Sequence, residues 1–277
     1  MVRATIHYVT NPPGPGEPML TYVTEDEARS TMCVEPGVDV EISDVRGANP
    51  TLRREGFQLV DHTSAVPDLE ALEGDADLDR VYGREMRSLL RDVTGAEAVY
   101  LLGGPKRRYG ESATAKLEHL SNAKPARYVH GDVTETSALR QATGLASMVP
   151  RLHLREYDRW VLYNMWRPIT PPPHDHPLAV CDARTIAPRH RVPVLAITEI
   201  RGFGHFEFET NGHVADPHHR WCWFRDMTPD EVLVFTTFDS DPTRPHQVAH
   251  TAFTDPGCPP GTPTRASVEL RALALWT

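Results

Sequence analysis

The final run of the chain, ASVELRALALW (residues 266–276), alternates polar with small or apolar residues, as a β-strand with two different faces does. Seven further β-rich runs precede it from residue 160 onward, each bounded by Pro, Gly, Asp or Asn instead of a helix. So many strands without intervening helices favour a sandwich or barrel over a parallel α/β sheet. We therefore predict an all-β core with flanking helices, built as a double-stranded β-helix (jelly roll).

The first half of the chain is mixed. Short β-rich runs occupy most of residues 1–65, and leucines at helical spacing predict an external helix over residues 68–95. A second external helix is expected over about residues 136–157. We predict a single domain over residues 1–277, in which residues 1–97 pack on a jelly-roll core formed by residues 98–277.

Composition excludes several classes of protein. The 277 residues carry a net charge of −9 with a pI near 5.8, which argues against a nucleic-acid partner. No apolar run is long enough to span a bilayer, and the first residues lack the apolar segment of a signal peptide. We expect a cytoplasmic protein without a membrane partner. The four cysteines form no CxxC pair and are expected to be reduced, packed thiols.

The stretch ARYVHGDVTE (residues 126–135) contains the first candidate for chemistry. In a strand, His130 and Asp132 point to the same side, so both could reach one ion inside a barrel. One imidazole and one carboxylate are two members of the facial triad that binds non-haem Fe(II). Alone, this pair is equally compatible with a polar surface, but a β-rich run far downstream supplies another histidine, His250.

The final strand offers cations and a hydroxyl on one face, because Arg265, Ser267, Glu269 and Arg271 alternate there. The Arg-x-Ser spacing lets a guanidinium and a hydroxyl bind one carboxylate together. Arg265 and Arg271 are both candidates for that role.

At this point the sequence resembles a known family, the iron(II)/2-oxoglutarate-dependent oxygenases that include the hydroxylase of cephamycin methoxylation and the fungal gibberellin desaturase. The resemblance runs over nearly the whole chain and rests on the order and spacing of several motifs. These motifs are GFQLVDHTSAVPD, VTGAEAVYLL, VHGD, NMWRPI, PLAVCDART, RWCWFRDMTPDEVLVFTTFDS, HTAFTDP and RASVELRAL.

The resemblance implies Fe(II) held by His130, Asp132 and His250. It also implies 2-oxoglutarate and O₂ as co-substrates, with Arg265 and Ser267 on the far carboxylate and Arg271 as the alternative. The implied activity is that of a hydroxylase or desaturase. It would act on a C–H bond of a small natural-product or amino-acid-derived substrate, while 2-oxoglutarate is decarboxylated to succinate. Gly131 is smaller than the residue that family members often have there.

Other residues have two interpretations. In NMWRP, Asn164 and Arg167 either pack structurally or line the site against co-substrate or substrate. His174, in the Pro-rich segment TPPPHDHP, is expected in an exposed loop, and His246 at the surface. The basic segment KRRYG (residues 106–110) is expected to be a solvated loop.

Two other classes of function remain open from the sequence. A cupin-like isomerase or dioxygenase without 2-oxoglutarate would need His130, Asp132 and His250 but not Arg265. A non-catalytic binding module would tolerate loss of any of them. Release of succinate separates the first interpretation from both. The oligomeric state is not readable from the sequence, and an enzyme of the same pathway is a candidate partner.

Overall fold

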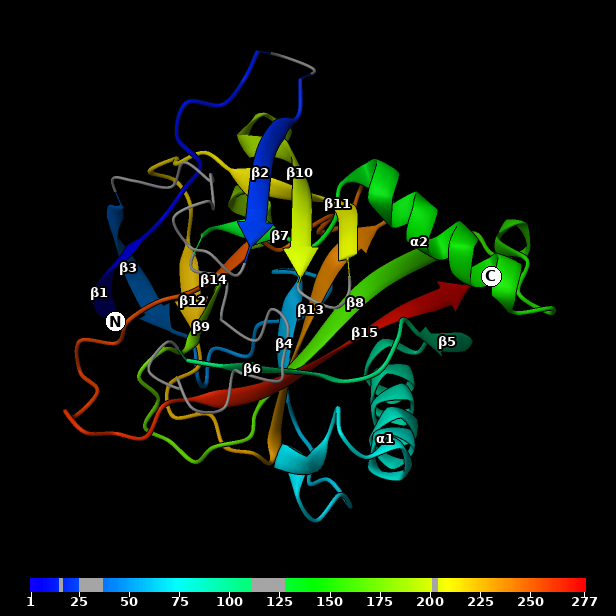
Figure 1. Cartoon of the computed structure of the whole chain (residues 1–277), viewed down its shortest axis with the longest axis horizontal. Coiled ribbons are helices and arrows are strands. Elements are labelled where there is room, and N and C mark those ends of the chain that lie inside the picture. Colours follow the sequence, from blue (N-terminus) through cyan, green and yellow to red (C-terminus); the bar gives the residue numbers. More distant parts are fainter. Residues whose placement is uncertain (15–16, 25–36, 111–127, 201–203) are drawn as a thin grey trace.

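The computed structural model describes residues 1–14, 17–24, 37–110, 128–200 and 204–277, and in them two β-sheets form the body of the molecule (Figure 1). The larger sheet has nine strands in the order β1-β3-β12-β9-β14-β7-β11-β10-β2. Its strands are β1 (Val2–Ile6), β2 (Met19–Thr24), β3 (Val38–Asp44), β7 (His130–Gly131), β9 (Leu178–Cys181), β10 (Arg191–Ile200), β11 (Gly204–His213), β12 (Trp221–Trp223) and β14 (His250–Ala252).

The smaller sheet has the order β4-β13-β8-β15-β5, with β6 also paired to β15. Its strands are β4 (Phe57–Asp61), β5 (Ala98–Leu101), β6 (Lys106–Tyr109), β8 (Arg159–Pro168), β13 (Glu231–Asp239) and β15 (Ala266–Trp276). Neighbours in this sheet are antiparallel throughout. The predicted jelly roll is confirmed, and the last strand spans the residues expected of it.

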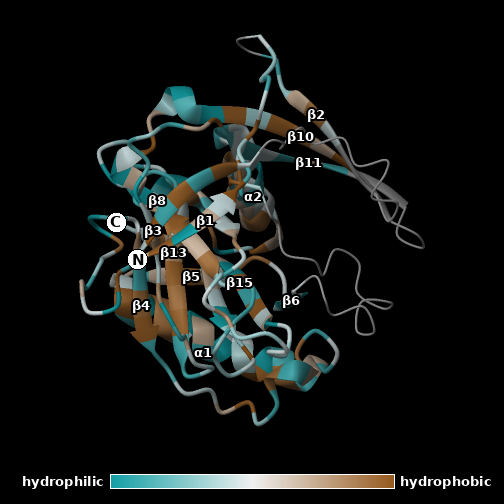
Figure 2. Cartoon of the chain, turned by 90° about the vertical axis from the view of Figure 1, so that its left-hand side faces the viewer, coloured by the Kyte–Doolittle hydropathy of each residue, from teal (hydrophilic) through white to brown (hydrophobic). Residues whose placement is uncertain are grey.

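Apolar side chains from both sheets meet between them. Phe57, Trp166 and Phe235 come from the smaller sheet, and Val180 and Cys222 come from the larger one. Burial of such side chains supplies the main driving force for closing the two sheets. In Figure 2, β2, β10 and β11 extend beyond the rest of the body on one side. Cys181 and Cys222 are buried free thiols, as predicted.

Helix α1 (Ala76–Thr94) covers the outer face of the smaller sheet, where Tyr82, Met86 and Leu90 enter a shared core. It begins at Asp75, whose carboxylate accepts from two backbone N–H groups, and ends at Gly95 in the left-handed conformation. The predicted start at residue 68 was wrong. Residues Leu69–Ala71 form a separate 3-10 turn, which is capped by Asp68. The helical conformation is interrupted between this turn and α1.

Helix α2 (Glu135–Met148) is capped by Thr134 and Ser137, which satisfy each other's backbone N–H groups. The predicted extension to residue 157 was wrong, because Pro150 cannot continue the helix and a 3-10 turn, Leu154–Glu156, follows. In the described part of the chain, neither helix is long and apolar enough to cross a bilayer.

Candidate functional site

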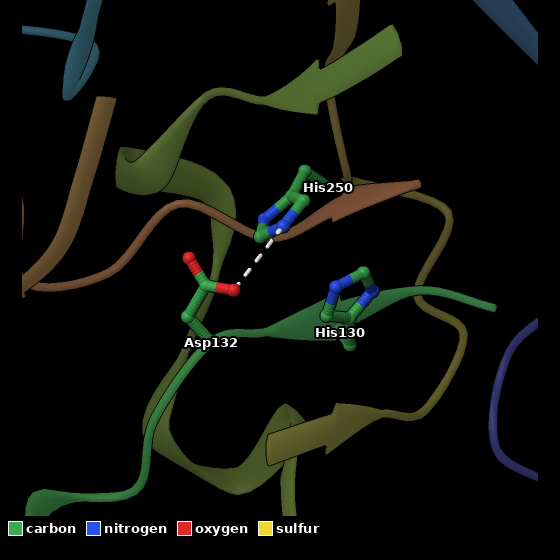
Figure 3. Close-up of side chains that lie close together, drawn as sticks. All are labelled: His130, Asp132 and His250. Atoms are coloured by element: carbon green, nitrogen blue, oxygen red, sulfur yellow. Dashed lines mark ion pairs between the residues drawn. The ribbon is translucent and has the colours of Figure 1, made fainter. Parts of the chain in front are cut away.

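His130, Asp132 and His250 come together at the centre of the nine-stranded sheet (Figure 3). His130 is paired with His250 across β7 and β14, and directly paired residues project to the same side. Asp132 follows β7 immediately. One ligand atom from each residue lies within 4.8 Å of the others, and His250 Nε2 is 3.9 Å from Asp132 Oδ1.

The two imidazole rings are held by backbone carbonyls. His130 Nδ1 lies 2.9 Å from the carbonyl oxygen of Tyr128, and His250 Nδ1 lies 3.3 Å from that of Val248. Because a carbonyl oxygen only accepts, each Nδ1 carries the proton and each Nε2 keeps a free lone pair. This is how metal-binding histidines are usually oriented.

Electrostatics keep the three groups ready to bind a cation. Burial lowers the pKa of His130 to about 3, and His250 adds to this effect, so the ring is neutral at neutral pH. Burial alone would raise the pKa of Asp132, but Arg271 and the two histidines outweigh it and hold that pKa well below its usual value. The donors are therefore the neutral imidazole of His130 and the carboxylate of Asp132, with the His250 imidazole beside them.

Two side chains from the smaller sheet hold Asp132. Arg271 donates to Oδ1 at 2.7 Å, and Asn164 Nδ2 donates to Oδ2 at 3.1 Å. Asn164 and Arg271 are direct partners across β8 and β15, so they reach the carboxylate side by side. Arg271 also lies 3.5 Å from Glu269, which Arg108 contacts at 2.8 Å. A row of alternating charges thus runs from the barrel wall to Asp132.

Arg265 directly precedes β15 and is 3% exposed. Its guanidinium donates to the Ser267 hydroxyl and lies 5.4 Å from the Trp166 ring centroid, while its Nε has no hydrogen-bond partner. No carboxylate lies within ion-pair distance of it among the described residues, and burial lowers its pKa to about 10. A buried cation without a counter-ion is costly, so this position is suited to receive an anion.

The structure does not bring Arg167 to this group. Arg167 lies on the opposite face of β8, where it donates toward His62 Nδ1 at 2.6 Å and stacks over the Tyr82 ring of α1. The physical reason is strand phase, because residues three apart on a strand face opposite sides. Of the two candidates in NMWRP, only Asn164 contacts the triad.

Three other sequence predictions need correction. His174 is buried at 6% exposure and its Nε2 lies 3.1 Å from the Thr170 carbonyl oxygen, so it is not in a solvated loop. Segment 106–110 is mostly strand β6, paired to β15. His246 is half-buried against the Phe238 ring, 4.6 Å away.

Sequence reasoning missed two residues that support the site. Asp175 accepts a hydrogen bond at 2.9 Å from the backbone N–H of Arg265 and fixes the start of β15. Gln247 fills the space beside Gly131, where a Cβ atom would lie 2.5 Å from its amide carbon. No signal in the sequence indicated Gln247, whereas Asp175 follows His174, which did draw attention.

A jelly roll with two histidines and one carboxylate converging between its sheets defines the class of non-haem iron oxygenases. Comparisons with known proteins give the family. Residues 6–275 match the family model described as "Oxidoreductase/YMDC permease-like domain". The hydroxylase/desaturase CTB9 of Cercospora beticola is 31% identical over 255 residues, covering 86% of this chain and 76% of CTB9.

Two further comparisons agree. The Fe(II)/2-oxoglutarate-dependent dioxygenase nvfI of Aspergillus novofumigatus is 29% identical, covering 79% of this chain and 72% of its own. A solved structure of the iron and alpha-ketoglutarate-dependent endoperoxidase NvfI superimposes with a TM-score of 0.83 at 25% identity, covering 99% of this chain and 97% of that one. The chain belongs to this family of Fe(II)/2-oxoglutarate-dependent oxygenases, as the sequence predicted, and its substrate is a small molecule.

Proposed function

We propose that His130, Asp132 and His250 hold the Fe(II) ion, and that Arg265 with Ser267 holds the distal carboxylate of 2-oxoglutarate. The observation that carries this assignment is the buried Arg265 guanidinium, which has a hydroxyl partner but no carboxylate among the described residues. A cupin-like enzyme without 2-oxoglutarate would leave this buried cation unexplained.

The donor set suits Fe(II). Two imidazoles and one carboxylate on one side of an ion leave other positions for co-substrates. When bound, the ion supplies the capacity to couple O₂ reduction and 2-oxoglutarate decarboxylation to attack on a substrate C–H bond. The side chains of the protein bind and orient the ion and its co-substrate, and they exclude water from the site.

Each side chain has a definite task. Asn164 and Arg271 hold both oxygens of Asp132 and so fix the direction of the carboxylate. The Phe235 ring, 4.8 Å from the His250 ring, excludes water from that side. The Trp166 ring and the Ser267 hydroxyl hold Arg265 in place, and a guanidinium fork matches a carboxylate in two places.

Titration of 2-oxoglutarate into the anaerobic Fe(II) protein tests the assignment, with the visible charge-transfer band as readout. Arg265→Ala should weaken 2-oxoglutarate binding by roughly one to two orders of magnitude, since a charge-assisted hydrogen bond contributes about 1.5–3 kcal/mol. Arg265→Lys should recover only part, because an ammonium lacks the planar fork. Iron content should stay unchanged.

Arg167→Lys is the matched control, because Arg167 is equally buried but faces α1. It should leave the titration midpoint where it is. An unchanged midpoint in Arg265→Ala would transfer the role to Arg271. If Arg167→Lys lost iron and also shifted the titration midpoint, general damage to the barrel would explain the effect of Arg265→Ala.

We infer that the reaction is a hydroxylation or a desaturation of a small natural-product or amino-acid-derived substrate, because relatives bear the name hydroxylase/desaturase. Product mass separates the two outcomes, as hydroxylation adds one oxygen and desaturation removes two hydrogens. A single domain over residues 1–277 is supported by the pairing of β1 and β3 into the larger sheet. The cytoplasmic location and a partner enzyme of the same pathway stay predictions.

A further inference from the structure

A row of hydrogen-bonded side chains, Trp221, Tyr8, His219 and His190, lies on the other face of the nine-stranded sheet, away from the triad. Trp221 Nε1 donates to the Tyr8 hydroxyl at 2.8 Å, and that hydroxyl lies 2.9 Å from His219 Nδ1. His219 Nε2 lies 2.9 Å from His190 Nδ1, and His190 Nε2 lies 3.1 Å from Asp216 Oδ2. Tyr8, Trp221 and His190 are each at most 4% exposed.

The direction of this chain follows from its two ends. An indole N–H only donates, so the Tyr8 oxygen accepts from Trp221 and its own proton is free to go to His219 Nδ1. At the other end the Ala187 backbone N–H, 3.1 Å away, donates to His190 Nδ1, which must therefore be the unprotonated nitrogen. Both imidazoles are then protonated at Nε2. The hydrogen bonds end at His190, whose Nε2 lies near the Asp216 carboxylate without a hydrogen bond to it.

In this arrangement, the Tyr8 phenol loses its proton only when it also loses one electron. Burial raises the pKa of the Tyr8 phenol well above its usual value and, as the largest effect, lowers the pKa of His219 to about 4. Simple ionisation of the phenol is therefore strongly disfavoured. A phenol that has lost an electron is a far stronger acid, and His219 is hydrogen-bonded to receive its proton.

Tyr8 also packs behind the strands that carry His130 and His250, beside a cavity. It belongs to the same core cluster as Val129 and Ala249, the residues directly before the ligand candidates His130 and His250. On its other side, Tyr8, Asp216, His219 and Trp221 line a cavity of about 760 Å³. A small reductant can approach the relay there without passing through the site itself.

We propose that Tyr8, with His219, His190 and Asp216, forms a protective redox relay for the iron site. It acts when O₂ has been activated and no substrate C–H bond is within reach. The proposal rests on iron being held by His130 and His250, as assigned above, and adds a second function to the chain.

The step balances in electrons and protons. If iron held by His130, Asp132 and His250 supplied a one-electron oxidant there, Tyr8 would give up one electron to it. The Tyr8 O–H bond breaks, and its proton moves to His219 Nδ1 as the His219 Nε2 proton moves toward His190 and Asp216. A neutral phenoxyl radical remains. A one-electron reductant of the enediol class, such as ascorbate, then returns the electron from the cavity, and the proton returns along the same bonds.

Freeze-quench EPR spectroscopy tests the relay in the full-length protein. The Fe(II) protein with 2-oxoglutarate and no substrate is mixed with O₂, and a tyrosyl radical signal is expected. Tyr8→Phe keeps the ring but should abolish the signal. His219→Gln offers an acceptor that cannot take a proton, so the signal should fall sharply. Ascorbate should shorten the radical lifetime in the unchanged protein.

Tyr100→Phe is the matched control, because Tyr100 packs in the separate core beneath α2 and should not affect the signal. Iron content and the charge-transfer band, measured before O₂ is added, separate failure of the relay from failure of the iron site. A signal that survives Tyr8→Phe, or disappears in Tyr128→Phe instead, overturns the proposal. If Tyr8→Phe does not fold, an unchanged signal in His219→Gln overturns it equally.

Discussion

Arg271 on β15 and Asp132 after β7 join the two sheets of the barrel through a hydrogen bond of 2.7 Å between Nη2 and Oδ1. The pair lies between the sheets, and the Asp132 side chain is only 3% exposed. The guanidinium already neutralises the carboxylate that a metal ion would bind. Iron and Arg271 therefore stabilise the same buried charge.

Arg271→Ala should accordingly destabilise the metal-free protein more than the iron-bound protein. Without iron, the variant leaves a buried carboxylate with Asn164 as its remaining hydrogen-bond donor, which costs about 1–3 kcal/mol. Bound iron replaces the lost charge and reduces the cost. Anaerobic denaturant unfolding with and without Fe(II) measures both values, and equal losses in the two states would refute the shared role.

Histidine and carboxylate variants test the triad directly. His130→Ala and Asp132→Ala should lose bound iron and turnover while the fold survives, because each removes one of three ligands. His174→Ala is the matched control, since it removes a histidine that is also buried but hydrogen-bonds a backbone carbonyl. Metal analysis after gel filtration gives the readout. Full iron occupancy in Asp132→Ala would disprove the assignment.

Asp175 should affect co-substrate binding without touching the co-substrate. Its carboxylate accepts from the backbone N–H groups of Arg265 and His176, so Asp175→Ala should let Arg265, the residue directly before β15, move. We expect 2-oxoglutarate binding to weaken by roughly three- to tenfold, or about 1 kcal/mol, with iron content unchanged. The charge-transfer titration measures it. A tighter midpoint would show that Asp175 competes with the co-substrate for Arg265 instead.

Gly131 and Gln247 should be energetically coupled. A Cβ at position 131 would lie 2.5 Å from the Gln247 amide carbon, and that amide is fixed by hydrogen bonds to Asn211, Val133 and Thr237. Gly131→Ala should therefore destabilise the protein and weaken iron binding, because the collision displaces His130 and Asp132. In Gln247→Ala the same change should cost less, giving a coupling of about 0.5–3 kcal/mol in a double-mutant cycle. Strict additivity would contradict the packing.

The metal-free protein should lose stability as the pH falls below about 6.5. The pKa values of three histidines are lowered in the folded protein. That of His130 falls to about 3 and that of His219 to about 4, and that of His213 falls well below its usual value. Between these values and the unfolded value of about 6.5, only the unfolded chain takes up the protons, so stability falls with decreasing pH. Each histidine contributes a slope of at most about 1.4 kcal/mol per pH unit.

His213 offers the clearest variant for this pH dependence. Its ring is fully buried, and neither nitrogen has a hydrogen-bond partner in the described part of the chain. His213→Leu should flatten the dependence of unfolding free energy on pH between 6.5 and 4, whereas exposed His153→Leu should not. An unaltered slope in His213→Leu would mean that this ring is protonated in the folded protein.

Strand periodicity predicted the jelly roll and placed Arg265, Ser267, Glu269 and Arg271 on one face of β15, as observed. It worked there because the last strand is long and pairs with a neighbour along its whole length. It failed at residues 126–135, of which 128–135 lie within the described part. The strand there has only two residues, because a single pairing with β14 ends it.

Long-range contacts explain the remaining differences. His174 looked exposed because its neighbours are prolines, and nothing local shows that β15 covers the loop. The segment Lys106–Tyr109 looked like a solvated loop because its charges are balanced by partners distant in sequence, such as Glu73 and Glu269. The position of Arg167 could have been predicted from the sequence NMWRP, because residues three apart on a strand, such as Asn164 and Arg167, face opposite sides.

The single residue pair between β7 and β14 has a mechanical consequence. Among the described residues, the nine-stranded sheet is continuous at its middle through the pair His130–His250 alone, and these are the residues assigned to the metal. A bound ion would act there as a cross-link between two halves of one sheet. Release of iron would remove this cross-link. The barrel would then become less stiff, including in strands that do not contact the ion.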